Sequence, residues 1–283
     1  MPAPTAKPAP ILFDRALLRR RQARAAHLGA ATFLLEQVIE DAVERLGSVN
    51  RTFVDGIDLA TPGALLRRAV QDRVATLSAV DVPVTDSDSL QLAPASVDLV
   101  LSVLALQFVN DLPGVLAQLR AALKPDGLLL AAIVGGDTLT ELRQSFAAAE
   151  AELEGGASPR VSPFADLRDA GGLLQRAGFA LPVTDLDRLT VRYDNAFALM
   201  QDLRRMGATN VLVEQRKLPT RRATMLRMAQ IYSERFADTD GRIRATFDII
   251  WLLGWAPHAS QQKPLRPGSA KFSLEAAVKR RPK

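Results

Sequence analysis

The clearest hydrophobic pattern lies in the middle of the chain. Residues 97–104 form a short apolar run rich in Val and Leu, which is typical of a strand buried on both faces. Asn110 and Asp111 can cap a following helix, in which apolar residues recur at helical spacing up to Leu123. After a Pro-Asp-Gly turn, residues 128–134 form a second apolar run. A strand, a crossover helix and a second strand predict a parallel sheet at the centre of the molecule.

The remaining pattern alternates strands with helices. It predicts strands over residues 52–59, 74–80, 186–193 and 245–255, helices over 24–46, 140–154, 164–176, 195–206 and 221–236, and a short helix after Thr61. This alternation predicts an α/β fold with a doubly wound, mostly parallel sheet, whose ligands bind at the carboxyl ends of the strands. The two helices within residues 195–236 stand between two strands, so we expect an inserted helical cap that covers one edge of the sheet.

The charge is concentrated at the two ends of the chain. The net charge is +5, but residues 1–24 carry +5 and residues 263–283 carry +6, which leaves −6 for the part between them. We therefore divide the chain into a basic, partly disordered N-terminal arm (1–24), a body (25–262) and a basic C-terminal tail (263–283). A nucleic-acid-binding face across the body is disfavoured. The basic ends either make peripheral contact with a membrane surface, RNA or an acidic partner, or are solvated tails.

The composition excludes several kinds of chemistry. The sequence has no cysteine, which excludes disulfides, thiolate catalysis and cysteine-ligated metals. With two histidines, a histidine-rich metal site is not expected. No apolar run is long enough to span a bilayer. We therefore expect a soluble globular protein without a resident metal.

Several short motifs resemble known families. Asp98-Leu99-Val100 and the stretch LKPDG at 123–127 resemble class I S-adenosylmethionine-dependent methyltransferases of type 11. More specific motifs resemble the mitochondrial complex I assembly factor 5 family and its bacterial relatives. These are Phe13-Asp14-Arg15, VNDLP at 109–113, GGDTL at 135–139 with ELR at 141–143, GGASP at 155–159, SPF at 162–164, residues 171–179 and Gly254-Trp255.

The resemblance implies a fold, a cofactor and a partner. It implies a seven-stranded, methyltransferase-like (Rossmann-like) sheet with an N-terminal helix, and S-adenosylmethionine as cofactor. The family is tied to arginine hydroxylation on a complex I subunit, so such a subunit is the expected protein substrate, in the bacterial cytoplasm or at the inner face of the respiratory membrane. A more distant relative methylates the malonyl group on acyl carrier protein. The alternative is an inactive pseudo-methyltransferase that serves as an assembly factor.

The resemblance also assigns candidate cofactor residues. In the family, the first strand ends in an acid and a glycine-rich loop, whereas here Asp58 is followed by Gly63 as the single glycine, which weighs against a seated cofactor. Asp81 lies 23 positions after Asp58, where an acid suits ribose hydroxyls. Asp86 resembles the acid that contacts the adenine amino group. Ser102 lies near the end of the central strand, although a buried Ser bonded to backbone is the common alternative.

Candidate catalytic residues follow two other strands. Asp137, Glu141 and Arg143 come just after the second central strand and are candidates for a substrate-facing cluster, although helix capping also explains the two acids. His258 follows the last strand in a polar loop, where a lone His is more often a surface residue. Gln107 follows the central strand and can hydrogen-bond a substrate, but an amide cannot act as a base.

Overall fold

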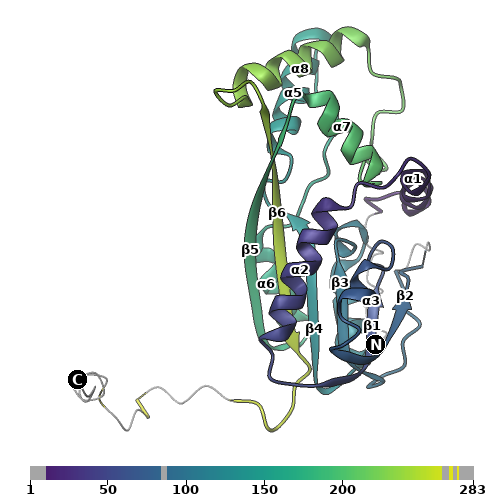
Figure 1. Cartoon of the computed structure of the whole chain (residues 1–283), viewed down its shortest axis with the longest axis vertical. Coiled ribbons are helices and arrows are strands. Elements are labelled where there is room, and N and C mark those ends of the chain that lie inside the picture. Colours follow the sequence, from purple (N-terminus) through teal and green to yellow (C-terminus); the bar gives the residue numbers. More distant parts are fainter. Residues whose placement is uncertain (1–10, 84–87, 263–267, 270–272, 274–283) are drawn as a thin grey trace, which may run out of the picture.

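The computed structural model describes residues 11–83, 88–262, 268–269 and 273, and it builds one six-stranded sheet covered by helices (Figure 1). The strands are β1 (Phe53–Leu59), β2 (Val74–Val80), β3 (Val97–Val103), β4 (Leu123–Gly135), β5 (Ala180–Tyr193) and β6 (Ile243–Trp255). The helices are α1 (Arg15–His27), α2 (Phe33–Gly47), α3 (Leu65–Ala69), α4 (Leu112–Ala122), α5 (Thr140–Glu154), α6 (Leu167–Arg176), α7 (Ala196–Arg205) and α8 (Arg222–Phe236), with a 3-10 turn at Leu106–Phe108.

The sheet confirms the predicted fold class. Its strand order is β2-β1-β3-β4-β6-β5, in which the first four strands are parallel and β6 and β5 are antiparallel to their neighbours. Within the described ranges the sheet has six strands, not the seven expected. The chain passes from β2 to β3 through residues 81–96, a stretch too short for both a helix and a further strand.

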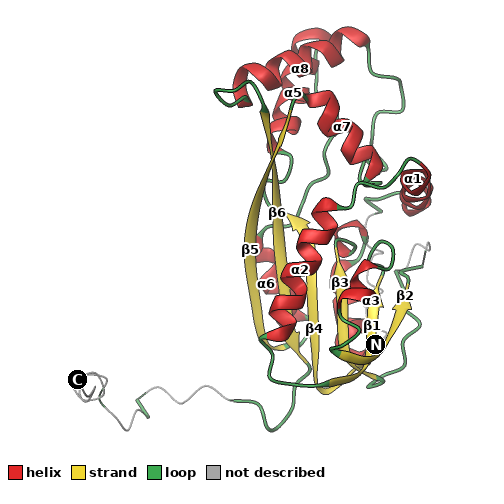
Figure 2. Ribbon diagram, viewed as in Figure 1, coloured by secondary structure: helices red, strands yellow, loops and turns green. Residues whose placement is uncertain are grey.

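The sheet is buried on both faces because its central strands are apolar on both sides. Alternate residues of β3 point to opposite faces. Leu99 and Leu101 join the core cluster that includes α2 and α3, whereas Val100 packs with α4 and α6. Figure 2 shows helices on both sides of the strands. Because helices cover both faces of the sheet, residues 97–103 do not show the regular alternation of apolar and polar side chains that is typical of a strand with one face in water.

A ribbon of two strands carries the cap beyond the sheet. The pairing of β4 with β6 ends at Gly135 and Asp248, but β6 continues back to Ile243, paired with β5 alone. Helices α5 and α8 pack together at this end, and α7 lies next to them at the top of Figure 1. We call residues 196–236 the cap. The cap therefore lies beyond the carboxyl end of β4, not simply along one edge of the sheet.

The N-terminal region differs from the prediction. The single helix expected over 24–46 is two helices, α1 and α2, because the chain turns at Gly29, whose φ of +78° favours glycine. The basic arm is also shorter than residues 1–24. Residues 11–27 belong to the folded body, since Phe13 and Leu18 are buried against Val211 and Leu212 of the cap loop. Residues 1–10 and most of the C-terminal tail lie outside the described residues.

A substitution at Gly135 tests the close packing at the junction of β4 and β6. A Cβ there would lie 2.2 Å from Ile250 Cδ1 and 2.9 Å from the backbone oxygen of Ala165. We expect Gly135→Ala to lower the free energy of unfolding by about 1–3 kcal/mol, because backbone has to move. A Cβ at Gly156 would meet nothing within 4 Å, so Gly156→Ala is the matched control. Denaturant titration of both variants measures the effect, and equal stabilities would contradict this packing.

Candidate functional site

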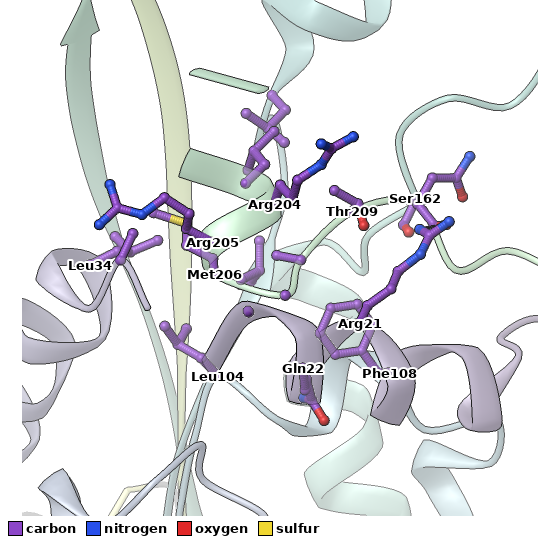
Figure 3. A pocket seen from close by; sticks show the side chains of 18 of the residues that line it. Arg21, Gln22, Leu34, Leu104, Phe108, Ser162, Arg204, Arg205, Met206 and Thr209 are labelled. Carbon is purple, nitrogen blue, oxygen red and sulfur yellow. Dashed lines mark hydrogen bonds between the residues drawn. The ribbon is translucent and has the colours of Figure 1, made fainter. Parts of the chain in front are cut away.

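A large cavity lies at the carboxyl ends of the parallel strands. Its volume is about 1410 Å³. The floor comes from the segments that follow β1, β2, β3 and β4, and the roof comes from α1, the start of α2, α7 and the loop after α7. Figure 3 shows Arg21 of α1, Leu104 after β3 and Arg204 of α7 on its wall. This is the place where ligands of doubly wound sheets bind.

Three candidate cofactor residues lie at or just after the ends of β1 and β2, and two of them line the cavity. Gly63, with φ +76°, and Asp81, whose carboxylate is 77% exposed, are both on the wall. Asp58 is buried beneath the loop and forms an ion pair of 2.7 Å with Arg67. Burial raises the pKa of Asp58 above its ordinary value, although the Arg67 guanidinium opposes the rise. Asp58 therefore supports the loop from below. Asp81 is exposed and forms a loose surface ion pair of 3.5 Å with Arg19, which a ligand can replace at little cost.

Of the two remaining candidate cofactor residues, the structure describes Ser102 but not Asp86. Ser102 is fully buried and its hydroxyl donates to the backbone oxygen of Leu59 at 2.9 Å, so the structure places it as a link between β3 and β1, away from the cavity. Asp86 lies outside the described residues, and its assignment stays a prediction. The acid that the structure does place in this loop is Asp88, which sequence reasoning had not singled out.

Asp88 joins the N-terminal segment to the core. Its buried carboxylate accepts from Arg15 at 2.8 Å and from the backbone N–H groups of Asn110 and Asp111 at 2.6 and 2.8 Å. Asn110 in turn accepts from the backbone N–H groups of residues 12 and 13. Arg15 belongs to the FDR motif, and Asn110 and Asp111 belong to the VNDLP motif, so these motifs were the sequence signal for this contact. Their role in the structure is to fix α1 over the cavity.

The proposed catalytic cluster does not gather around the cavity. Asp137 pairs with Arg188 of β5 at 2.8 Å. Glu141 is buried and accepts from the hydroxyl of Thr246 at 2.5 Å, and Arg143 donates to a backbone oxygen. None of the three candidates lines the cavity. They brace the junction between α5 and the β5-β6 ribbon, which corrects the expectation of a substrate-facing cluster.

His258 lies at the opposite end of the sheet. Because β6 is antiparallel to β4, the carboxyl end of β6 lies beside the amino end of β4, where Trp255 pairs with Leu128. The His258 ring contacts Ser260 at 2.7 Å in an exposed turn. The structure therefore separates His258 from the cavity by the length of the strands.

Buried charges behind the roof hold the cap in place. The carboxylate of Glu150 on α5 is 1% exposed and accepts from Arg160 and from the backbone N–H of Ser158 at 2.6 Å. Burial opposes ionisation, but the hydrogen bonds from Ser158 and Arg160 outweigh it and lower the pKa of Glu150. Arg160 also donates to Thr220 of the cap loop at 2.8 Å. The GGASP motif and the arginine that follows it thus connect α5 to the cap.

Two polar atoms in the cavity wall have no hydrogen-bond partner among the described residues. These are Gln107 Oε1, on the turn after β3, and Thr209 Oγ1, in the loop after α7. An unpaired buried acceptor costs free energy, so each of these groups favours a ligand that supplies a donor. The Gln107 amide is oriented by its own N–H, which donates to the backbone oxygen of Leu104 at 2.8 Å.

The described ranges lack two features. No three His, Asp or Glu side chains gather there as a metal site would require. No helix in those ranges is long and apolar enough to cross a membrane.

The fold and the cavity define the protein as a methyltransferase-fold α/β domain. Residues 41–131 match the family model described as "Methyltransferase domain". The YcgJ protein of Bacillus subtilis matches with a TM-score of 0.51 and 12% identity, over 78% of this chain and all of that one. A crystal structure from Bacillus halodurans C-125, assigned as a methyltransferase, matches with a TM-score of 0.50 and 15% identity, over 76% and 97% of the two chains.

Sequence relatives identify the family within this class. The chain is 37% identical to "Arginine-hydroxylase NDUFAF5, mitochondrial" of Danio rerio over 93% of its own length and 88% of that protein. It is also 37% identical to the human protein of the same name, over 93% and 82% of the two chains. A malonyl-[acyl-carrier protein] O-methyltransferase of Xylella fastidiosa is 42% identical over 61% and 56% of the two chains. The chain belongs to the NDUFAF5 family, as the sequence motifs indicated.

The lowered pKa of Glu150 gives a pH-dependent prediction. Its contribution to stability is complete above the ordinary glutamate pKa, about 4.3, and is lost as the pH falls through the lower folded-state value. We expect Glu150→Gln to cost about 2 kcal/mol at neutral pH and much less near pH 3. Denaturant titrations at the two pH values measure this, with Glu44→Gln, an exposed acid on α2, as control. A pH-independent difference would contradict the assignment.

Proposed function

We propose that this protein binds S-adenosylmethionine at the carboxyl ends of β1–β3 and modifies an arginine side chain of a complex I subunit. The observation that carries the proposal is the cavity of about 1410 Å³ at the carboxyl ends of the parallel strands, whose wall includes Leu139, Ser162 and Phe164 of the family motifs. It has room for a nucleoside cofactor and a protein side chain together, since cavities for drug-sized ligands measure about 300–1,000 Å³.

The wall fits the nucleoside part of the cofactor. The exposed carboxylate of Asp81 is a suitable acceptor for ribose hydroxyls, and a Cβ at Gly63 would meet nothing within 4 Å, so the backbone there is open to close approach. Asp58 lies beneath this wall, with one carboxylate oxygen paired to Arg67 and the other without a hydrogen-bond partner among the described residues. S-adenosylmethionine supplies an activated methyl group when bound.

Arginine is supported as the target by the full-length relatives. Those that align with 93% of the chain carry the name arginine-hydroxylase, whereas the O-methyltransferase relative aligns with 61%. Gln107 Oε1, unpaired in the described structure, is a suitable acceptor for a guanidinium N–H after a small side-chain rotation. We therefore propose hydroxylation as the modification: one oxygen atom of O2 enters a C–H bond of the arginine side chain, and the other leaves as water with two electrons from an external reductant. Bound S-adenosylmethionine supplies no oxygen atom to this reaction. Methyl transfer is the second candidate because the fold favours it, and no observation favours an inactive protein.

We also propose where the protein works and with what. The relatives are mitochondrial by name, and a bacterial protein of this family would meet the corresponding complex I subunit in the cytoplasm, at the inner face of the respiratory membrane.

Calorimetric titration with S-adenosylmethionine tests the cofactor assignment. We expect micromolar binding, weakened about tenfold in Asp81→Asn because an amide is a poorer acceptor than a carboxylate for two hydroxyls. Asp72→Asn is the control, since Asp72 is exposed before β2 and does not line the cavity. An unchanged affinity in Asp81→Asn, or no binding by the folded wild type, would refute the assignment.

Mass spectrometry of a complex I subunit incubated with the protein tests the reaction. A gain of one oxygen atom on arginine supports hydroxylation, and a gain of one methyl group supports methyl transfer. We expect Gln107→Leu to lower kcat/KM about tenfold by removing the acceptor, and Gln107→Glu to lower KM by adding a charge that attracts the guanidinium. If both variants behave as wild type, Gln107 does not contact the substrate.

A further inference from the structure

Two basic stretches that are far apart in sequence form one surface over the cavity. Residues 11–27, which include α1, carry five arginines against one aspartate. Residues 196–222, which include α7 and the cap loop, carry six basic side chains against two acids. The second stretch stands out because residues 25–262, to which it belongs, are acidic overall. We call the surface formed by α1 and residues 196–222 the basic roof.

Specific contacts hold the two stretches together despite their like charge. The Arg21 guanidinium donates to the backbone oxygen of Asn210, and the backbone N–H of Asp14 donates to the oxygen of Val211 at 2.8 Å. Arg205 Nε donates to the oxygen of Gly29 at 2.7 Å. Backbone oxygens, which are neutral acceptors, satisfy these contacts. Arg15, Arg19 and Arg205 are paired with Asp88, Asp81 and Asp202, so these acids compensate part of the positive charge of the roof. The contacts between the two stretches do not compensate the rest.

Several arginines of the roof have no acidic partner among the described residues. Arg20 and Arg24 are exposed on α1, and Arg204 is exposed on α7 and lines the cavity. By contrast, Arg160 and Arg216, deeper in the wall, are paired with Glu150 and Glu154. The fold thus neutralises the inner arginines and leaves the outer ones available. Like charges held close together in this way are stabilised when an anionic partner binds.

Apolar side chains accompany these charges at the cavity. Phe197 is 43% exposed and Leu218 is 71% exposed, and both line the cavity with Arg204. A surface that offers cations and large apolar groups together matches a polypeptide with both carboxylates and apolar side chains. It matches a nucleic acid less well, because bases prefer several stacking aromatics and Phe197 is the one aromatic side chain in the described roof segment 196–222.

The proposed substrate adds a further argument. A guanidinium that enters a cavity under a positive roof is repelled, and the repulsion grows as water is excluded. Carboxylates on either side of the target arginine would neutralise the roof at the moment of entry. An acidic flanking sequence therefore lowers the cost of bringing a cationic side chain to Gln107.

We propose that the basic roof binds an acidic, partly apolar segment of the substrate protein, with carboxylates against Arg24 and Arg204 and apolar side chains against Phe197 and Leu218. This contact directs the target arginine into the cavity and selects substrates by the charge of the flanking residues. The inference rests on the proposed function and extends it to substrate recognition.

Fluorescence anisotropy with the full chain tests the proposal. The probe is a labelled peptide with one central arginine flanked by Glu residues interspersed with Leu, and a peptide with Lys in place of Glu is its counterpart. We expect the acidic peptide to bind and the Lys peptide not to bind, with Arg24→Gln/Arg204→Gln weakening the former roughly tenfold. The matched control is Arg168→Gln/Arg176→Gln, which removes two exposed charges from α6 outside the cavity. The wild type and the two double variants share the same residues 1–10 and 263–283.

The outcomes separate this inference from the proposed function. Equal weakening in the two double variants, or equal binding of the two peptides, would overturn the role of the roof. The role of the roof would also be overturned if Arg24→Gln/Arg204→Gln weakened binding to phosphatidylserine vesicles, or to a single-stranded oligonucleotide, more than it weakened binding to the peptide. S-adenosylmethionine titrations on the same preparations report the cofactor site independently. If the protein binds S-adenosylmethionine but not the acidic peptide, only the inference is refuted. If it binds the peptide but not S-adenosylmethionine, the cofactor assignment is refuted.

Discussion

A carboxylate taken out of water has to be paired, and Asp88 meets this requirement by drawing three segments together. It accepts from Arg15 and from two backbone N–H groups at the start of α4. The segment that contains Arg15 is in turn bonded to the cap loop through Asp14 and Phe13. The core, the N-terminal helix and the cap therefore depend on one buried charge, and the cavity is the space that remains between them.

The β5-β6 ribbon positions the cap beyond the carboxyl end of β4. Because β6 extends beyond the last residue of β4 to which it pairs, α5 and α8 pack on the ribbon above the sheet. Glu150 and Glu154 on α5 then hold Arg160 and Arg216 of the cavity wall. Residues of the family motifs, such as Leu139, Ser162 and Phe164, thus line the wall of the cavity, while the sheet below has the common methyltransferase fold. The division fits a family in which a shared core serves different substrates.

The surroundings of each acidic side chain decide whether its carboxylate can contact a ligand. Asp58 lies near the end of β1 and Asp81 directly follows β2, yet Asp58 is buried against Arg67, whereas Asp81 is exposed and pairs loosely with Arg19 at 3.5 Å. Asp137 and Glu141 lie one turn beyond the same edge but face the ribbon, where Arg188 and Thr246 bind them. A position at the end of a strand therefore does not make a carboxylate available to a ligand. Its burial and the strength of its ion pair decide this.

The sequence by itself determined the elements and the class of fold, because burial of a strand on both faces or of a helix on one face leaves a local periodicity. It also indicated the family through short motifs. The tertiary structure alone decided the six-stranded order, the break between α1 and α2, and the partner of each charged residue. The Arg15–Asp88 pair joins residues 73 positions apart. No local pattern encodes such a pair, since it depends on the path of the chain between them.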